Sequence, residues 1–320
     1  MPAERGAVRI AIGSLALLGL VNLVIGLIQM RDPGFAWPFA GRPSIFPSGL
    51  FGHYNHLADF SLVSAALLSA RFYFARDGVL ERAVQLIGAL ANVSCVLISQ
   101  SRGGMISLCV ATVTLIALVA LVAWRDKARN RRILAVSAVA MPLIAAAVAI
   151  PVLSGFQESR GIENRTIETF ADNKSRLQFI GLAIDSTANH PLEGGGSRSF
   201  GWQKYAAWKP SEAGMIAAND DFVHNELLQV ATDYGWIGAA LVGLAIIATV
   251  LCGITGILGA EGGPSRRAQD ALACGGLAAM AGTLVHSNFS FVTHTLPGTL
   301  YLGLAIGCAL PRRSATEGFS

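Results

Sequence analysis

Eight apolar runs dominate the chain, and most are long enough to cross a lipid bilayer as a helix. A membrane-spanning helix needs roughly 20 apolar residues, and none of the runs alternates apolar and polar positions as barrel strands do. We therefore predict an all-α polytopic membrane protein of about eight transmembrane helices. The expected spans, of which the last is short, are residues 9–30, 57–74, 84–100, 105–124, 133–153, 237–259, 271–287 and 295–310.

Composition supports this prediction. The 320 residues are 53% hydrophobic and only 14% charged, and the mean hydropathy is +0.53. These values exclude an ordinary soluble globular domain. All five cysteines fall inside apolar runs and none has a C-x-x-C spacing, so we interpret them as buried apolar residues and predict no zinc or redox site.

Basic residues in the loops predict the orientation. The loop at 125–132 reads RDKARNRR, and most other Lys and Arg residues near the span ends fall on the same side of the eight-span arrangement. The short loops on the opposite side carry only Arg31, Arg42 and Arg102. Because cytoplasmic loops hold an excess of Lys and Arg, both termini are predicted to lie in the cytoplasm.

Polar residues divide the chain into three regions. Residues 1–153 hold the first five spans, and residues 237–320 hold the last three with a short cytoplasmic tail. Between them, residues 154–236 carry eleven acidic and seven basic residues, and this segment is predicted to face outward. We expect the function to reside in this external segment, which contains short helices.

The first external helix is predicted from Lys174 to Thr187, capped by Asp172 or Asn173 and ended by Pro191 and the glycines after it. Its apolar residues share one face: Leu177, Ile180, Gly181 and Ile184.

A second helix is predicted from Phe222 to Tyr234, with Asp220 or Asp221 as its cap and Gly235 as its end. His224 and Asn225 would then lie in its first turn. The positive end of a helix disfavours an imidazolium, so His224 would stay neutral and able to accept a proton. The same helix end would attract an anion.

Three side chains are the main candidates for chemistry, and each also has a plain structural interpretation. Arg102, in SQSRGG at 99–104, is either a snorkelling anchor or an anion-binding group, and Gly103 and Gly104 would let a ligand approach the backbone. Arg176 is equally consistent with a solvated residue, and His224 with a structural histidine.

Other chemistries find little support. His53 and His56 lack a nearby carboxylate or cysteine partner, and capping explains at least one of the paired aspartates, so we predict no metal site. His286, Asn288 and His294 surround the last external turn. The sequence contains no P-loop, dinucleotide fingerprint or nucleophile elbow, and we expect no nucleic-acid partner.

Five stretches, taken in order, resemble the O-antigen ligase and O-antigen polymerase superfamily of bacterial membrane glycosyltransferases. They are GHYNHLA (52–58), SQSRGG (99–104), SRLQFIGLAIDSTANHPLEGGG (175–196), HNELLQVATDYGWIG (224–238) and HSNFSF (286–291). Each piece is weak alone, but their order, spacing and external placement together are specific.

The resemblance implies an enzyme of the inner membrane that works on the periplasmic face. Its donor is a glycan on undecaprenyl pyrophosphate, and it needs neither metal nor cofactor. By resemblance, Arg102 and Arg176 match the pyrophosphate-binding arginines, and His224 matches the catalytic histidine. Asn225, Gly195, Gly196 and His286 are possible supporting residues. Membrane lipids are the other expected contacts.

The resemblance leaves the acceptor open. The leading hypothesis is a ligase that attaches a carrier-linked polysaccharide to lipid A core, with inversion at the sugar. A polymerase of O-antigen or exopolysaccharide, a protein O-oligosaccharyltransferase and, from a different class, a non-catalytic transporter of lipid-linked glycans are the alternatives. Against transport, the sequence shows neither pseudo-symmetric halves nor broken helices.

One feature departs from the family pattern, because a single predicted span precedes GHYNHLA where members usually have more. We expect a chain that is short at its N-terminus, with an incomplete lipid groove. A short natural member, a mis-started reading frame and an inactive remnant all fit this feature.

Overall fold

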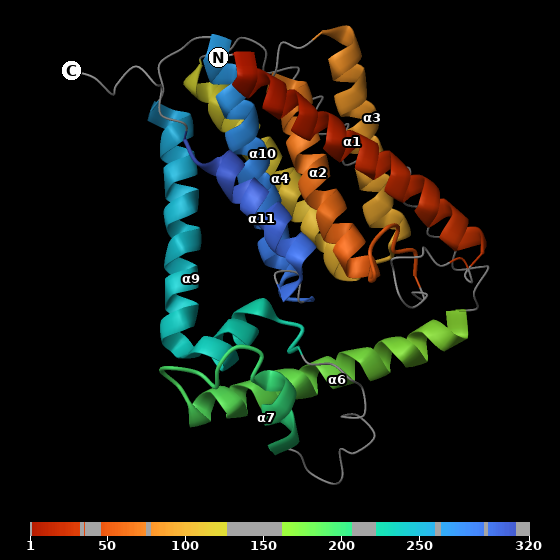
Figure 1. Cartoon of the computed structure of the whole chain (residues 1–320), viewed down its shortest axis with the longest axis vertical. Coiled ribbons are helices and arrows are strands. Elements are labelled where there is room, and N and C mark those ends of the chain that lie inside the picture. The colour runs from red at the N-terminus through yellow and green to blue at the C-terminus, as the bar shows by residue number, and fades with distance from the viewer. Residues whose placement is uncertain are drawn as a thin grey trace. The chain divides into compact units, whose positions relative to one another are not determined.

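The protein is described here from a computed structural model. The structure describes residues 2–32, 35, 46–74, 78–126, 162–206, 222–259, 264–290 and 294–311, and these contain no β-strand, which confirms the all-α prediction. Its helices are α1 (Pro2–Arg31), α2 (Tyr54–Phe74), α3 (Val79–Ile98), α4 (Arg102–Arg125), α6 (Ile162–Asn189), α7 (Phe200–Ala206), α9 (Glu226–Gly259), α10 (Pro264–His286) and α11 (Leu296–Ala309) (Figure 1).

Among the described residues, six helices are long and apolar enough to cross a membrane, namely α1, α2, α3, α4, α9 and α10. They coincide with six of the eight predicted spans, and the chain is a multi-pass membrane protein. The predicted span 133–153 lies outside the described residues. The last predicted span corresponds to α11, whose 14 residues are few for crossing a bilayer.

The chain divides into two compact units. The first contains α1 to α4, α10, α11 and the part of α9 from Thr249 onward. The second contains α6, α7, the part of α9 up to Ala248, and the connection Ser287–Thr295 between α10 and α11. This connection therefore belongs to the second unit, although the two helices that it joins belong to the first.

In the first unit, α10 packs against α2 and α4, and the three helices run side by side (Figure 1). Small residues permit this approach. A Cβ atom added at Gly282 of α10 would lie 2.8 Å from Leu62 and 3.0 Å from Ala111, which belong to the buried apolar cluster of this unit. Close contact between small residues is the usual way in which helices associate in lipid, where burial from water contributes little.

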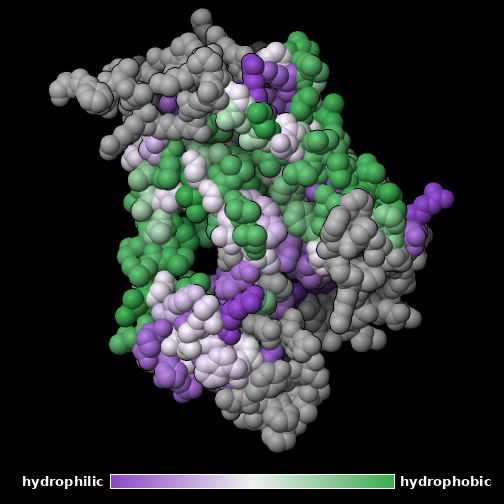
Figure 2. Space-filling view, in the orientation of Figure 1, coloured by the Kyte–Doolittle hydropathy of each residue, from purple (hydrophilic) through white to green (hydrophobic). Residues whose placement is uncertain are grey.

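On the face seen in Figure 2, hydrophobic residues gather over α9 and over α1. In α9, Leu241, Leu244 and Ile247 are 56–63% exposed. Such exposure is expected where lipid tails, and not water, surround a helix. The expectation of buried cysteines is correct for Cys95 and Cys274 and wrong for two others, Cys109 and Cys252, which are exposed. Cysteine packs as a small apolar residue, so a lipid-facing position suits it equally well.

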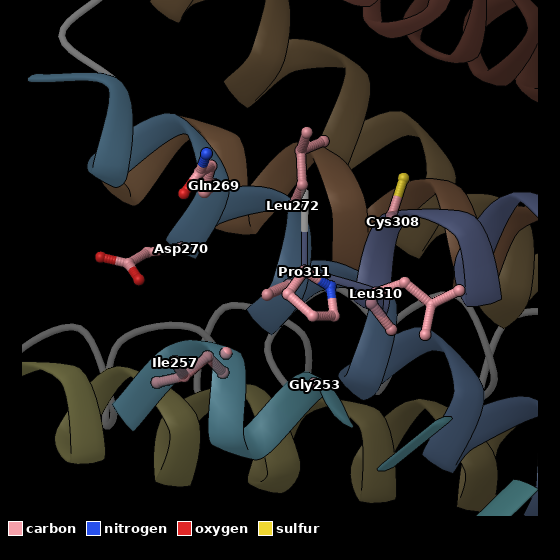
Figure 3. Close-up of a pocket in the computed structure, with 11 residues that line it drawn as sticks. Gly253, Ile257, Gln269, Asp270, Leu272, Cys308, Leu310 and Pro311 are labelled. Atoms are coloured by element: carbon pink, nitrogen blue, oxygen red, sulfur yellow. The ribbon is translucent and has the colours of Figure 1, made fainter. Parts of the chain in front are cut away.

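A buried ion pair joins α4 to α10 in the first unit. Arg125 Nη1 and Nη2 donate to the two carboxylate oxygens of Asp270 at 3.1 and 2.9 Å. Arg266, which is 6% exposed, donates from Nη2 to the carbonyl of Ile257 at 2.8 Å. Beside Asp270, a pocket opens between α9, α10 and α11, and its other lining residues are mostly small or apolar, such as Gly253 and Pro311 (Figure 3).

Replacing Asp270 with alanine is expected to destabilise the first unit by about 3–5 kcal/mol, because Arg125 and the more deeply buried Arg266 would both lose this carboxylate. Thermal unfolding in detergent measures this. Asp126→Ala is the matched control, since Asp126 Oδ1 also bonds Arg125, at 2.7 Å, but its side chain is 46% exposed. That loss is expected to stay below about 1 kcal/mol. Equal losses of stability in the two variants would contradict the assignment of Asp270 as the buried carboxylate that stabilises this unit.

Candidate functional site

Arg102 is the first residue of α4 and its side chain is exposed. The chain turns sharply before it, because Gln100 adopts a positive φ of 54°. Ser101 then caps the new helix, its Oγ accepting a hydrogen bond from the Gly104 amide at 3.0 Å. A serine cap satisfies an amide that the first turn of a helix leaves without a partner. SQSRGG thus places an arginine at the start of a capped helix.

A row of buried polar side chains lies beneath this turn. Ser101 Oγ donates to Asn55 Oδ1 at 2.7 Å and lies 3.4 Å from His286 Nε2. His286 Nδ1 is 3.2 Å from Asp59 Oδ1, and neither side chain is exposed. His286, expected as a supporting residue of the site, therefore contacts the capping serine, and its ring is buried within the first unit.

Gly104 has a packing role that the sequence did not suggest. A Cβ atom at this position would lie 2.6 Å from the Cβ of Ala58 in α2. The glycine thus allows α2 to approach α4. This helix packing explains why position 104 is a glycine, without any need for a ligand there. Gly103 is also buried.

In the second unit, α6 begins earlier than predicted. It starts at Ile162, so the predicted caps Asp172 and Asn173 lie inside the helix and Arg176 is not at its start. Asp and Asn cost a helix only a fraction of a kcal/mol relative to Ala, and residues 162–173 contain no Gly or Pro to interrupt it.

The apolar face predicted for this helix packs only in part, since Ile180 contacts the core of the second unit and two other members of the face do not. Leu177 and Ile184 are 69% and 54% exposed, whereas Phe179 and Ala183 are buried with Phe200 and Val223 in the apolar core of the second unit. The sequence pattern permits both choices, because α6 carries apolar residues on two faces.

His224 lies just before a helix and not within its first turn, as was predicted. Helix α9 begins at Glu226, and Asn225 Oδ1 accepts a hydrogen bond from the Leu228 amide at 3.0 Å. Asn225 is therefore the cap, the role predicted for Asp220 or Asp221, both of which lie outside the described residues. His224 itself has a positive φ of 58°, uncommon for a residue other than glycine. Its ring is nearly parallel to that of Phe179, with 6.4 Å between centroids.

Gly235 does interrupt the helix, as predicted, with φ of 67°. The glycines at 194–196 pack against this point. The amides of Gly195 and Gly196 donate to the carbonyls of Thr232 and Asp233, each at 2.9 Å. A Cβ atom at Gly194 would lie 2.4 Å from the Gly235 nitrogen. Gly195 and Gly196 thus use their amides to cap the end of the helix that follows His224.

The connection Ser287–Thr295 brings the candidate residues of the second unit together. The Glu226 amide donates to the Ser287 carbonyl at 2.8 Å, and Asn225 Nδ2 donates to Asn288 Oδ1 at 3.3 Å. Arg176 Nη1 donates to the carbonyl of the next residue, Phe289, at 3.0 Å. Arg176 and Asn225, the residue after His224, therefore bind two adjacent residues of one turn. Arg102 and His286 belong to the first unit.

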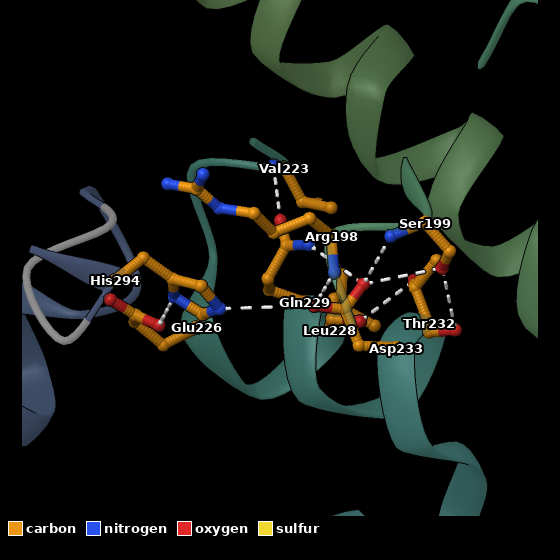
Figure 4. A network of polar contacts seen from close by, with 9 residues as sticks. All are labelled: Arg198, Ser199, Val223, Glu226, Leu228, Gln229, Thr232, Asp233 and His294. Carbon is orange, nitrogen blue, oxygen red and sulfur yellow. Dashed lines mark hydrogen bonds and ion pairs between the residues drawn. The ribbon is translucent and has the colours of Figure 1, made fainter. Parts of the chain in front are cut away.

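A charged network adjoins this turn, and the sequence analysis missed most of it (Figure 4). Asp233 is 1% exposed and accepts hydrogen bonds from the Arg198 amide at 3.0 Å and the Ser199 amide at 3.1 Å. His294 Nδ1 lies 2.6 Å from Glu226 Oε2. Glu226 and Asp233 are seven residues apart, two helical turns, which puts them on one face of α9. This seven-residue spacing is the sequence signal that could have identified Glu226 and Asp233 as a pair.

Among the described residues, no group of three or more His, Cys, Asp and Glu side chains could hold a metal ion. Guanidinium groups bind phosphate oxygens through paired hydrogen bonds, and an imidazole can accept a proton.

Comparison with known families extends these observations. Residues 87–243, which include Arg102, Arg176 and His224, match the family model for O-antigen ligase. No match was found among curated proteins. The match covers three of the five motifs, those that begin at residues 99, 175 and 224, and it agrees with the multi-pass helical fold. The match, which spans just under half of the chain, supports the O-antigen ligase/polymerase superfamily.

Proposed function

We propose that the protein transfers a glycan from undecaprenyl pyrophosphate to an acceptor hydroxyl at the periplasmic face of the bacterial inner membrane. The family match supports a glycosyltransferase acting on a lipid-linked glycan. The observation that carries the proposal further is the shared turn at 288–289, which accepts hydrogen bonds from both Arg176 and Asn225, the residue after His224. Arg176, proposed to bind phosphate, and His224, proposed to accept a proton, are about 50 residues apart in the sequence and are linked through this one turn.

The proposed reaction is a single displacement. The acceptor oxygen forms a bond to the anomeric carbon while the bond from that carbon to the pyrophosphate oxygen breaks, and the bonding electrons leave with the pyrophosphate. His224 takes the proton of the acceptor hydroxyl as general base. Arg102 and Arg176 stabilise the negative charge that grows on the leaving group. Attack opposite the leaving group inverts the anomeric carbon.

The orientation proposed from the sequence places both termini in the cytoplasm. Residues 154–236 would form the periplasmic segment between spans of residues 1–153 and 237–320. This orientation follows from the basic loops alone, and it puts Arg102, Arg176 and His224 on the side where carrier-linked glycans are displayed.

We propose lipid A core as the acceptor, with another carrier-linked glycan or a protein as the alternatives for the same site. Deletion of the gene separates the first two. Loss of all lipid A-linked polymer, with carrier-linked polymer retained, is expected for a ligase. Products of a single repeat unit would instead indicate a polymerase.

Purified protein given a lipid-linked donor and an acceptor is expected to turn over without ATP and in the presence of EDTA. Arginine side chains supply the positive charge in this mechanism, so chelation should change the rate by less than about twofold. The product linkage should be inverted relative to the donor. Retention of configuration would refute the single displacement, and absence of any transfer would favour a transporter.

A further inference from the structure

His294 faces a carboxylate with each of its ring nitrogens. Nδ1 lies 2.6 Å from Glu226 Oε2, and Nε2 lies 3.9 Å from Asp233 Oδ2. The side chain is 17% exposed, and those of Glu226 and Asp233 are 9% and 1% exposed. An imidazole between two buried carboxylates is favoured in its doubly protonated form, because each N–H then points at a negative oxygen.

The two carboxylates are themselves held in place. Asp233 accepts hydrogen bonds from the amides of Arg198 and Ser199 and from Gln229 Nε2 at 3.1 Å. Glu226 is the first residue of α9 and its amide binds the Ser287 carbonyl. His294 thus binds one end of the Ser287–Thr295 connection to two residues of α9 that lie two helical turns apart. The other end is bound through the Ser287 carbonyl, which accepts from the Glu226 amide.

We propose that His294 is a positioning residue that locks the Ser287–Thr295 connection onto α9 and so fixes Arg176 and the His224–Asn225 pair relative to each other. Asn288 and Phe289, which bind Asn225 and Arg176, lie within this connection. The inference rests on the proposed function, because it assigns His294 a role in assembling that site. In its doubly protonated form His294 cannot act as a base, because neither ring nitrogen can accept a further proton.

The contacts of His294 with the two carboxylates, which form this lock, depend on pH. Burial alone would lower the pKa of His294, and Arg198 opposes protonation as well. The hydrogen bond to Glu226 and the charges of Glu226 and Asp233 outweigh both effects and raise the pKa above its ordinary value of 6.5. A raised pKa means that the lock is complete below pH 6.5 and is lost as the pH rises through the pKa in the folded protein.

His294→Gln tests the lock, because glutamine retains a donor for Glu226 and loses the charge. We expect the kcat of transfer to fall about 10- to 100-fold, as misplacing a catalytic group by ~1 Å does. The KM for the donor should change less than about twofold. In the wild type, kcat should fall at high pH as His294 loses its proton, and this fall should be absent from the variant. Hydrogen exchange of the Glu226 amide, which binds Ser287, should become faster.

His190→Gln is the matched control. His190 Nδ1 lies 3.2 Å from Glu193 Oε1 in the same unit, but the two side chains are 52% and 70% exposed. We expect kcat and exchange at Glu226 to match the wild type, because an exposed pair contributes little. Changes equal to those of His294→Gln would overturn the specific assignment of His294.

Wild-type protein provides a test that needs no variant to fold. Exchange at Glu226, corrected for intrinsic rates, should accelerate as the pH rises through the His294 pKa, which NMR of labelled histidine measures directly. Exchange independent of that titration would overturn the lock. A wild-type protein without transferase activity would overturn the proposed function instead, while the exchange measurement would still decide whether the lock exists.

Discussion

Replacing His224 with asparagine is expected to lower kcat/KM for glycan transfer by about 100- to 10,000-fold, the usual contribution of a general base. Asparagine is the informative substitution because His224 has a positive φ of 58°, which asparagine tolerates better than most residues. The backbone and the cap at Asn225 should therefore survive, while the proton acceptor is lost. Initial rates with purified protein and a lipid-linked donor measure the effect.

Two further substitutions separate chemistry from structure. His190→Asn removes an exposed histidine of the same unit and is expected to leave the rate unchanged. Asn225→Ala removes the helix cap, and should cost about 1 kcal/mol of stability with a smaller loss of rate than His224→Asn. If His224→Asn transferred glycan at the wild-type rate, His224 would have no role as a base, and its strained backbone would need another explanation.

The membrane spans could be predicted from the sequence because their signal is local. A run of about 20 apolar residues has few alternatives to a transmembrane helix, and the runs at 9–30 and 105–124 lie within α1 and α4. Gly235 was likewise predictable as a helix break, since glycine adopts positive φ without strain.

Helix starts in the second unit were not predictable from composition alone. Asp172, Asn173 and Asn225 are all residue types that favour caps, and only the last of these three is one. The choice depends on tertiary contacts, because the start of α9 is also fixed by the Ser287 carbonyl, more than 60 residues away in the sequence. Long-range contacts routinely override local preference.

The charged residues of the site illustrate the same limit. Arg176 and His224 were found by resemblance, whereas Glu226 and Asp233 were passed over because their partner, His294, is distant in sequence. Likewise His286 was expected beside the ligand, and its buried contacts with Asp59 and Ser101 depend on the packing of α10 against α2 and α4. Periodicity identifies which residues share a helix face, and it does not identify what that face contacts.

Replacing Arg102 is the second prediction with a large effect, and it separates a binding arginine from a membrane anchor. Arg102→Ala is expected to reduce kcat/KM about 100-fold or more, because a charge-assisted contact that forms on the leaving group would be lost. Arg102→Lys keeps the charge but not the paired donors, so an intermediate loss is expected. Inhibition by free undecaprenyl pyrophosphate, measured for each variant, reports the same loss as weaker binding.

Neighbouring residues make this experiment decisive. Ser101→Ala removes the cap of α4, with its bond to the Gly104 amide, and is expected to cost about 1 kcal/mol of stability while Arg102 remains. Arg9→Ala removes a 65% exposed arginine near the start of α1, paired with Glu81, and should leave transfer unchanged. An anchoring role predicts wild-type rates in Arg102→Lys, because lysine also snorkels to the interface. A binding role predicts a measurable loss in that variant, and the two roles are therefore distinguished by a single conservative substitution.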